Sequence, residues 1–199
     1  MENETAVKFP PYHSGELTMN RYSTIVLVVV LAAVTFAQNP APQQPAAAPA
    51  NPLSTEAKQM YNGVKNNLIK MAEKMPEENY AFKATPDVRT FGQLVGHVAD
   101  SQARTCGMLI GDTKQLGASS KTSKADLVAA LKESFAMCDK AFDSLTSDAE
   151  AVKLVQMGQR QSTRVGALVR TVSHSNEEYG YMSVYMRLKG IVPPSSEGR

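Results

Sequence analysis

The chain has no tryptophan, only two cysteines and three histidines, and no marked excess of charge of either sign. Its 199 residues carry 21 basic and 19 acidic side chains, and no run of lysine or arginine stands out. A nucleic-acid-binding protein normally shows a basic patch or stripe, because phosphate contacts dominate its affinity. The even distribution of charge therefore argues against a nucleic acid as partner.

The longest apolar run, Ile25 to Phe36, is short of the roughly 20 residues that a membrane-spanning helix needs. Arg21 precedes this run and the small residue Ala37 follows it, which is the pattern of a secretory signal peptide cleaved after Ala37. We therefore expect export, to the periplasm or by secretion, and contact with a membrane only through an uncleaved leader. We expect translation to start at Met19, within a leader and signal peptide of residues 1–37.

Residues 38–52 contain five prolines among alanine, glutamine and asparagine. Such a composition cannot bury a core and favours an extended, solvated linker. The remaining residues, 53–199, are long enough for one domain with a proper hydrophobic core.

Within 53–199 the apolar residues recur at helical spacing. This spacing predicts four helices, at about 54–75, 90–110, 123–145 and 163–189. The fold class is therefore all-α, a four-helix bundle. The connections of about 10–15 residues are longer than a simple bundle requires, and they leave space for a long crossover or for loops that wall a pocket.

Local signals mark the ends of these helices. Thr90 and Gln93 have the capping-box pattern, and Ser123 is a good N-cap for the third helix. Gly190 is expected to end the fourth helix. Residues 151–157 are the best strand candidate, but they have no partner. The expected apolar stripe of the first helix consists of Met60, Val64, Leu68, Met71 and Met75.

Cys106 and Cys138 fall on the expected core stripes of the second and third helices. In an exported protein they can form a disulfide, which the chain-entropy model values at roughly 3–4 kcal/mol for a loop of this length. The alternative is a pair of buried free thiols that pack as small apolar groups.

The last expected helix carries His174 and Glu178, four residues apart and therefore on one face. Two ligand-type side chains at this spacing can hold one metal ion without bending the backbone. Outside the leader the only other histidine is His97, on the second helix. Both histidines lie about 100–120° from the centres of their apolar stripes, at flanking positions where a bundle opens to solvent. They can therefore face each other across one mouth of the bundle, although each alone could be a packed or solvated side chain.

Two stretches of sequence carry a family resemblance. The first runs from residues 82–87 (Phe-Lys-Ala-Thr-Pro-Asp) into residues 89–94 and His97, and the second comprises residues 174–180 and 185–194. From about residue 54 to residue 196 the chain resembles the DinB-like (DinB/YfiT) superfamily, whose members are proposed metalloenzymes. The resemblance implies a four-helix bundle in which three histidines hold a divalent metal, at positions that correspond here to His97, His174 and Glu178.

Glu178 departs from that pattern, because a histidine is expected there. Two histidines and one carboxylate can still bind Zn, Ni, Fe or Mn. Equally, the change can mark a site that no longer binds metal.

The resemblance also implies a small-molecule substrate and a reaction of hydrolase or transferase type, since relatives include thiol-dependent transferases. Export argues against a low-molecular-weight thiol as cofactor, because such thiols are cytoplasmic. Asp100, one turn beyond His97, could orient that imidazole or serve as a base, or it could be a solvated surface acid. The alternative to an enzyme is a non-catalytic envelope bundle that binds a small ligand, a metal or a protein in the same cleft. The sequence is also compatible with a homodimer.

Overall fold

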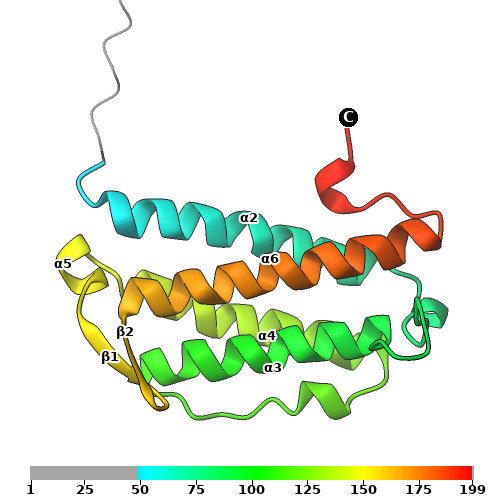
Figure 1. The fold of residues 1–199 in the computed structure, drawn as a ribbon, viewed down its shortest axis with the longest axis horizontal. Helices are drawn as coiled ribbons and strands as arrows, with labels where there is room; N and C mark the ends of the chain where they lie inside the picture. The colour runs from blue at the N-terminus through cyan, green and yellow to red at the C-terminus, as the bar shows by residue number, and fades with distance from the viewer. Residues whose placement is uncertain (1–48, 199) are drawn as a thin grey trace, which may run out of the picture. The chain divides into compact units, whose positions relative to one another are not determined.

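The computed structural model describes residues 49–198, and these residues are mostly helical (Figure 1). The expected signal peptide, the start at Met19 and most of the expected linker lie outside the described residues. The elements in chain order are α2 (Pro52–Lys74), η1 (Glu77–Asn79), α3 (Phe91–Ile110), η2 (Ala118–Ser120), α4 (Lys124–Asp143), α5 (Asp148–Ala151), β1 (Leu154–Met157), β2 (Arg160–Thr163), α6 (Arg164–Leu188) and η3 (Pro194–Ser196). The predicted all-α class is confirmed, with one small hairpin added.

Helices α3 and α4 begin where their predicted caps stand, and α6 begins after a cap of the same kind. The Thr90 side chain accepts a hydrogen bond from the Gln93 amide, and the Gln93 side chain accepts one from the Thr90 amide, which completes the capping box. Ser123 caps α4 and Thr163 caps α6 in the same way, each accepting from an amide three residues on. These side chains satisfy amides that have no partner inside a helix, so they fix the helix starts.

The start of α2 is capped from a distant part of the chain. Asn51 stands at the N-cap but makes no side-chain bond to the helix. Instead Asp148, at the start of α5, accepts from the amides of Leu53 at 3.2 Å and Ser54 at 3.1 Å. The amide of Asp148 donates in return to the Asn51 side chain at 3.2 Å. These hydrogen bonds join the start of α2 to the start of α5, so they connect a part of the chain that precedes α3 and α4 to a part that follows them.

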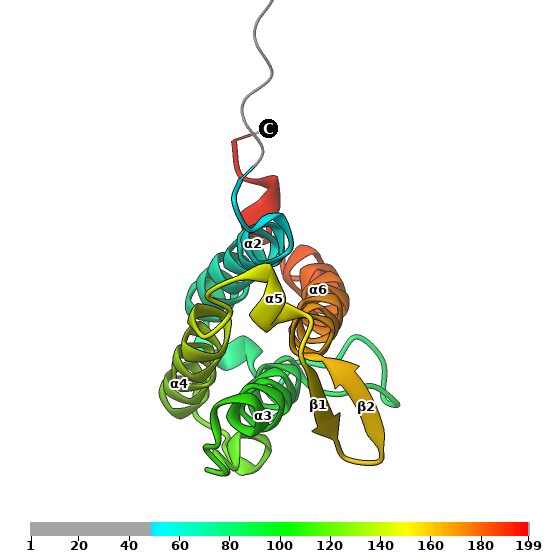
Figure 2. The same cartoon turned by 90° about the vertical axis from the view of Figure 1, so that its left-hand side faces the viewer.

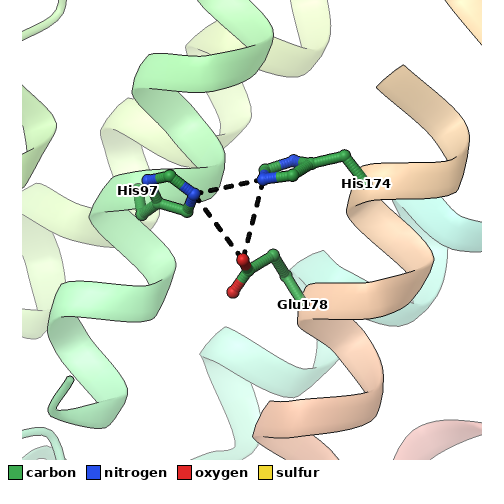
Figure 3. Close-up of side chains that lie close together, drawn as sticks. All are labelled: His97, His174 and Glu178. Carbon is green, nitrogen blue, oxygen red and sulfur yellow. Dashed lines mark hydrogen bonds and ion pairs between the residues drawn. The ribbon is translucent and has the colours of Figure 1, made fainter. Parts of the chain in front are cut away.

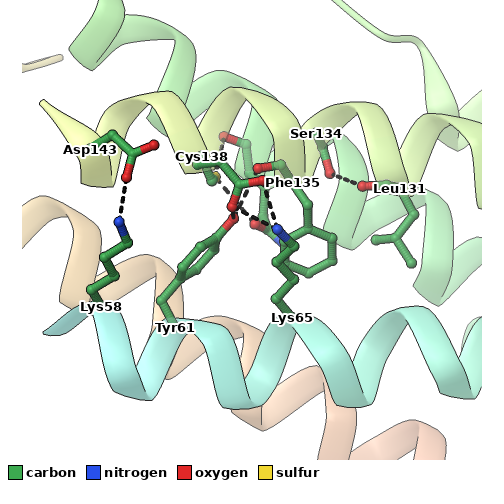
Figure 4. A network of polar contacts seen from close by, with 10 residues as sticks. Lys58, Tyr61, Lys65, Leu131, Ser134, Phe135, Cys138 and Asp143 are labelled. Carbon is green, nitrogen blue, oxygen red and sulfur yellow. Dashed lines mark hydrogen bonds and ion pairs between the residues drawn. The ribbon is translucent and has the colours of Figure 1, made fainter. Parts of the chain in front are cut away.

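One residue of the predicted stripe of α2 is wrong. Met60 is 51 % exposed, and Tyr61 takes its place in the core at 1 % exposure. The Tyr61 ring stacks on Phe142, with centroids 4.2 Å apart. Its hydroxyl donates to the Phe135 carbonyl oxygen at 2.9 Å (Figure 4) and lies 2.7 Å from Asp139. A tyrosine can occupy this position because its apolar ring is buried while its hydroxyl keeps a polar partner.

The four long helices surround one core, but they do not alternate in direction. Contacts of α3 with α4 pair early residues with early ones and late with late, as in Gly92 against Leu127 and Gly107 against Met137, so these two helices are parallel. Residues 111–123, which connect α3 to α4 in sequence, run back along the bundle (Figure 1). They form a long crossover, one of the two arrangements that the long connections allow, and α3 packs antiparallel to α6.

The hairpin is the main feature of the fold that the sequence did not predict. Residues 151–157 were expected to lack a strand partner, yet β1 pairs antiparallel with β2, from Leu154 opposite Thr163 to Met157 opposite Arg160. Gly158 turns the chain with a φ of 64°, which glycine adopts without strain. The hairpin lies at one end of the bundle beside α3 and α6 (Figure 2).

The disulfide joins the two parallel helices. The sulfurs of Cys106 on α3 and Cys138 on α4 are 1.99 Å apart, and both residues are fully buried. Over residues 49–198, the structure contains no helix both long and apolar enough to cross a membrane.

Candidate metal centre

Three potential ligands meet between α3 and α6. The Nε2 atoms of His97 and His174 are 3.1 Å apart, and each lies 3.6 Å from Oε1 of Glu178 (Figure 3). His97 comes from α3, and the other two residues stand one turn apart on α6. The structure thus brings together all three residues that the sequence singled out as a metal site.

The burial of these side chains differs from the expectation in one respect. Both histidines are 29 % exposed, in keeping with flanking positions, whereas the Glu178 side chain is only 6 % exposed. The face of α6 that carries Glu178 into the protein also buries Thr171 and Ser175. Because this face is made of small and polar side chains, the pattern of apolar residues in the sequence does not reveal that it is buried.

The surroundings favour the uncharged forms of two members of the group, Glu178 and His97. Burial raises the pKa of Glu178 above its ordinary value, although the charges of His174 and Arg89 act in the opposite direction. Burial, followed by the charges of Arg89 and His174, lowers the pKa of His97. A neutral imidazole is the form that binds a metal, and a cation would offset the cost of the buried carboxylate.

The donor set fits a divalent ion. Ligands at about 2.0–2.1 Å in a tetrahedral arrangement are separated from one another by about 3.3–3.4 Å. The three distances here, from 3.1 to 3.6 Å, bracket that separation. Oε2 of Glu178 is buried and has no hydrogen-bond partner among the described residues. His97, His174 and Glu178 could therefore hold a metal without movement of the helices.

Asp100 has a different place. Its carboxylate accepts hydrogen bonds from the Ala118 amide at 2.8 Å, the Ser119 amide at 2.8 Å and the Ser119 hydroxyl at 2.6 Å. Burial raises its pKa, but these hydrogen bonds outweigh burial and lower the pKa below its ordinary value. Among the described residues no hydrogen bond joins Asp100 to His97. The carboxylate fastens the crossover to α3, and a catalytic role for it stays a prediction.

A cavity of about 520 Å³ lies beside the centre, and His174 forms part of its wall. The other wall residues come from α3, from α6 and from the hairpin. They include Arg104, Arg160 and Arg170, which were not predicted from the sequence as site residues. A signal was available for Arg170, which precedes His174 by four residues and so shares its face. Arg160 could not be placed, because the hairpin itself was not predicted.

Fold and site together define an α-helical bundle with a two-histidine, one-carboxylate group that could hold a divalent metal. The family model of the DinB superfamily matches residues 60–182, more than half of the chain, and the protein therefore belongs to the DinB superfamily. Its fold is similar to that of a DinB-like protein from Bacillus cereus ATCC 10987, with a TM-score of 0.62 and 17 % sequence identity. That match covers 70 % of this chain and 95 % of the other. The comparison with curated proteins gave no match.

Proposed function

We propose that this protein is an exported, metal-dependent enzyme of the DinB superfamily, of hydrolase or transferase type. His97, His174 and Glu178 would hold the ion, which would be Zn, Ni, Fe or Mn. The observation that carries the proposal is the convergence of three ligand atoms from two helices, within 3.6 Å of one another, with one of the three residues, His174, in the wall of a cavity.

The cavity supports an enzyme rather than a purely structural metal site. Its volume lies within the range of about 300–1,000 Å³ that is usual for small-molecule sites. Three protein ligands leave a coordination position open, and an ion so held acts as a Lewis acid toward a group placed there. Because His174 belongs both to the ligand set and to the cavity wall, a molecule in the cavity would lie directly beside the centre.

Export is supported by the disulfide. Disulfides persist in oxidising compartments and are rare in the cytosol, so the buried Cys106–Cys138 bond is compatible with a secreted or periplasmic protein. Together with the signal-peptide pattern of residues 20–37, it favours a substrate found outside the cytoplasm.

One observation favours the alternative, a non-catalytic bundle that binds a ligand in the same cleft. No aspartate, glutamate, lysine or cysteine is among the described residues that line the cavity, and His174 is committed to the ligand set. A general acid or base for a reaction would then have to come from the substrate or from water near the centre.

Metal content tests the proposal. The protein would be expressed from its full-length sequence, purified without chelators or a histidine tag, and analysed by plasma mass spectrometry beside a His97→Ala/His174→Ala variant. We expect near-stoichiometric metal in the wild type and loss of metal in the variant. Glu177→Gln, which changes an exposed neighbouring carboxylate, should leave the metal content unchanged. A wild type that stays empty after reconstitution with Zn, Ni, Fe and Mn would overturn the enzyme proposal and favour the binding protein.

A further inference from the structure

The wall of the cavity carries positive charge from three separate elements. Arg104 stands on α3, Arg160 on β2 and Arg170 on α6. They are three of the six arginines in residues 49–198, and no acidic residue is among the described residues of the wall. In a chain with a formal net charge of only +2, this grouping is a local feature and not the result of a basic composition.

These arginines also lack partners within the described part of the chain. Their side chains make no hydrogen bond, and no carboxylate of residues 49–198 lies within 4.0 Å of them. By comparison, six of the twelve lysines in residues 49–198 form ion pairs with carboxylates: Lys58, Lys65, Lys74, Lys114, Lys132 and Lys153. Apart from the longer-range attraction between Arg104 and Asp100, the positive charge of the cavity therefore has no ion-pair partner among the described residues.

The two facing helices connect the arginines to the candidate metal centre. On α6, Arg170 precedes His174 by one turn, and both line the cavity. On α3, Arg104 follows His97 by two turns. Because α3 and α6 are antiparallel, both rows lead from the centre toward the hairpin, where Arg160 borders the cavity.

We propose that this cavity binds a small organic anion, a carboxylate or a phosphate ester, whose oxyanion group is held by Arg104, Arg160 and Arg170. The planar guanidinium group presents paired donors that match an oxyanion in a bidentate manner. Met108 and Met157 supply apolar surface for the carbon part of such a molecule. That the anion is also the substrate rests on the proposed function, since only then does the remainder of the molecule reach a metal beside His174.

Anion binding can be measured apart from metal binding. The protein would be stripped of metal by a chelator, dialysed and titrated by calorimetry with succinate, with inorganic phosphate and with succinamide, the uncharged analogue of succinate. We expect the wild type to bind at least one of the two anions, more weakly at higher salt, and to show no binding of succinamide. A preference between succinate and phosphate would identify the group that carries the oxyanion.

Two double variants with equal loss of charge show whether the cavity is responsible. Arg104→Gln/Arg170→Gln should weaken anion binding at least tenfold. Lys70→Gln/Lys140→Gln, on the exposed surfaces of α2 and α4, should change it less than twofold. Arg160→Gln, which changes only the hairpin, should weaken binding without altering the two helices. Equal losses in the arginine and lysine variants, or none in either, would overturn the proposal.

The outcomes for the cavity and for the metal are separable. A wild type that holds metal but binds neither anion overturns the cavity proposal and leaves the proposed function standing. A wild type that binds anions through the arginines but holds no metal supports the cavity proposal and overturns the enzyme.

Discussion

The surroundings of Glu178 disfavour a charged carboxylate, because burial raises its pKa. Its side chain is only 6 % exposed, and one of its two oxygens has no hydrogen-bond partner among the described residues. A buried polar group without a partner costs about 1–3 kcal/mol. Such a cost is understandable where a ligand supplies the missing partner, so Glu178 is the residue whose substitution separates the metal-bound from the metal-free protein most clearly.

We predict opposite effects of Glu178→Gln in the two states. In the metal-stripped protein it should leave stability unchanged or raise it by about 1 kcal/mol, because the buried charge is removed. It should also abolish the rise in melting temperature that added metal causes. Thermal unfolding with and without metal measures both. Glu178→His, which restores the three-histidine set that the family resemblance implies, should keep the rise, and persistence of the rise in Glu178→Gln would contradict the ligand assignment.

Asp100 gives a pH-dependent prediction. Its folded pKa lies below the ordinary value, so its contribution to stability is present above the unfolded pKa of about 3.9 and is lost as the pH falls through the lower, folded value. Asp100→Asn should therefore cost about 1 kcal/mol at pH 7, because the charged acceptor of three hydrogen bonds on a partly exposed site becomes a neutral one. Urea unfolding should show the two proteins converging in strongly acidic solution. A difference of equal size at pH 7 and pH 2 would argue against this role.

At the residue scale, the sequence predicts which side chains share a helix face better than it predicts which neighbouring element each of them contacts. The spacing of His174 and Glu178 on a helix was sufficient to predict that they share a site. Asp100 follows His97 closely and seemed equally well placed, yet its oxygens bond to Ala118 and Ser119. Which side of α3 would face the crossover depends on a tertiary contact that no local pattern reveals.

At the scale of elements, the crossover of residues 111–123 is held tightly against α3. A Cβ added to Gly107 would lie 2.2 Å from the carbonyl oxygen of Asp112, and one added to Gly96 would lie 2.8 Å from that of Ala118. These glycines admit the backbone of the crossover to the surface of the helix. Asp100, between them in sequence, adds its hydrogen bonds to the same segment.

Gly107→Ala should therefore destabilise the protein by about 1–3 kcal/mol, as overpacking does, because backbone cannot yield as a flexible side chain can. Gly63→Ala is the matched control, since an added Cβ meets nothing within 4 Å in the middle of α2. That control should stabilise the protein by about 0.5–1 kcal/mol, the helix preference of alanine over glycine. Chemical denaturation of both variants gives the comparison, and a neutral Gly107→Ala would mean that the crossover is loosely attached.

The local sequence predicts the helices much more clearly than it predicts the hairpin. Recurring apolar residues mark the long helices, and α3 and α4 also begin at predicted capping residues, so the helix limits were predicted within about two residues. β2 reads Arg-Gln-Ser-Thr, without the alternation of apolar and polar residues by which a half-buried strand is recognised. The hairpin forms because Gly158 permits a tight turn and because the adjoining helices provide a surface, and the second condition is tertiary.

At the scale of the whole molecule, the disulfide ties together helices that the chain connects only by the long crossover. Its two cysteines are 32 residues apart in sequence. Replacement of both, Cys106→Ala/Cys138→Ala, should lower the free energy of unfolding by about 3–4 kcal/mol, mainly because the unfolded chain gains freedom. Denaturation under non-reducing conditions measures this loss. Metal content should be unchanged, since the ligands lie on α3 and α6, and unchanged stability would show that the bond adds nothing.

Helix α3 is the element through which both strong links of the bundle pass, so it should unfold last. The disulfide joins α3 to α4, and a bound ion would join α3 to α6. In the described part of the chain, α2 takes part in neither link. It is held by packing, by ion pairs such as Lys58 with Asp143 (Figure 4) and by the cap from Asp148. Separation of α2 therefore breaks no strong bond. We expect its amide hydrogens to exchange with solvent first and those of α3 last, with the gap widening when metal is added.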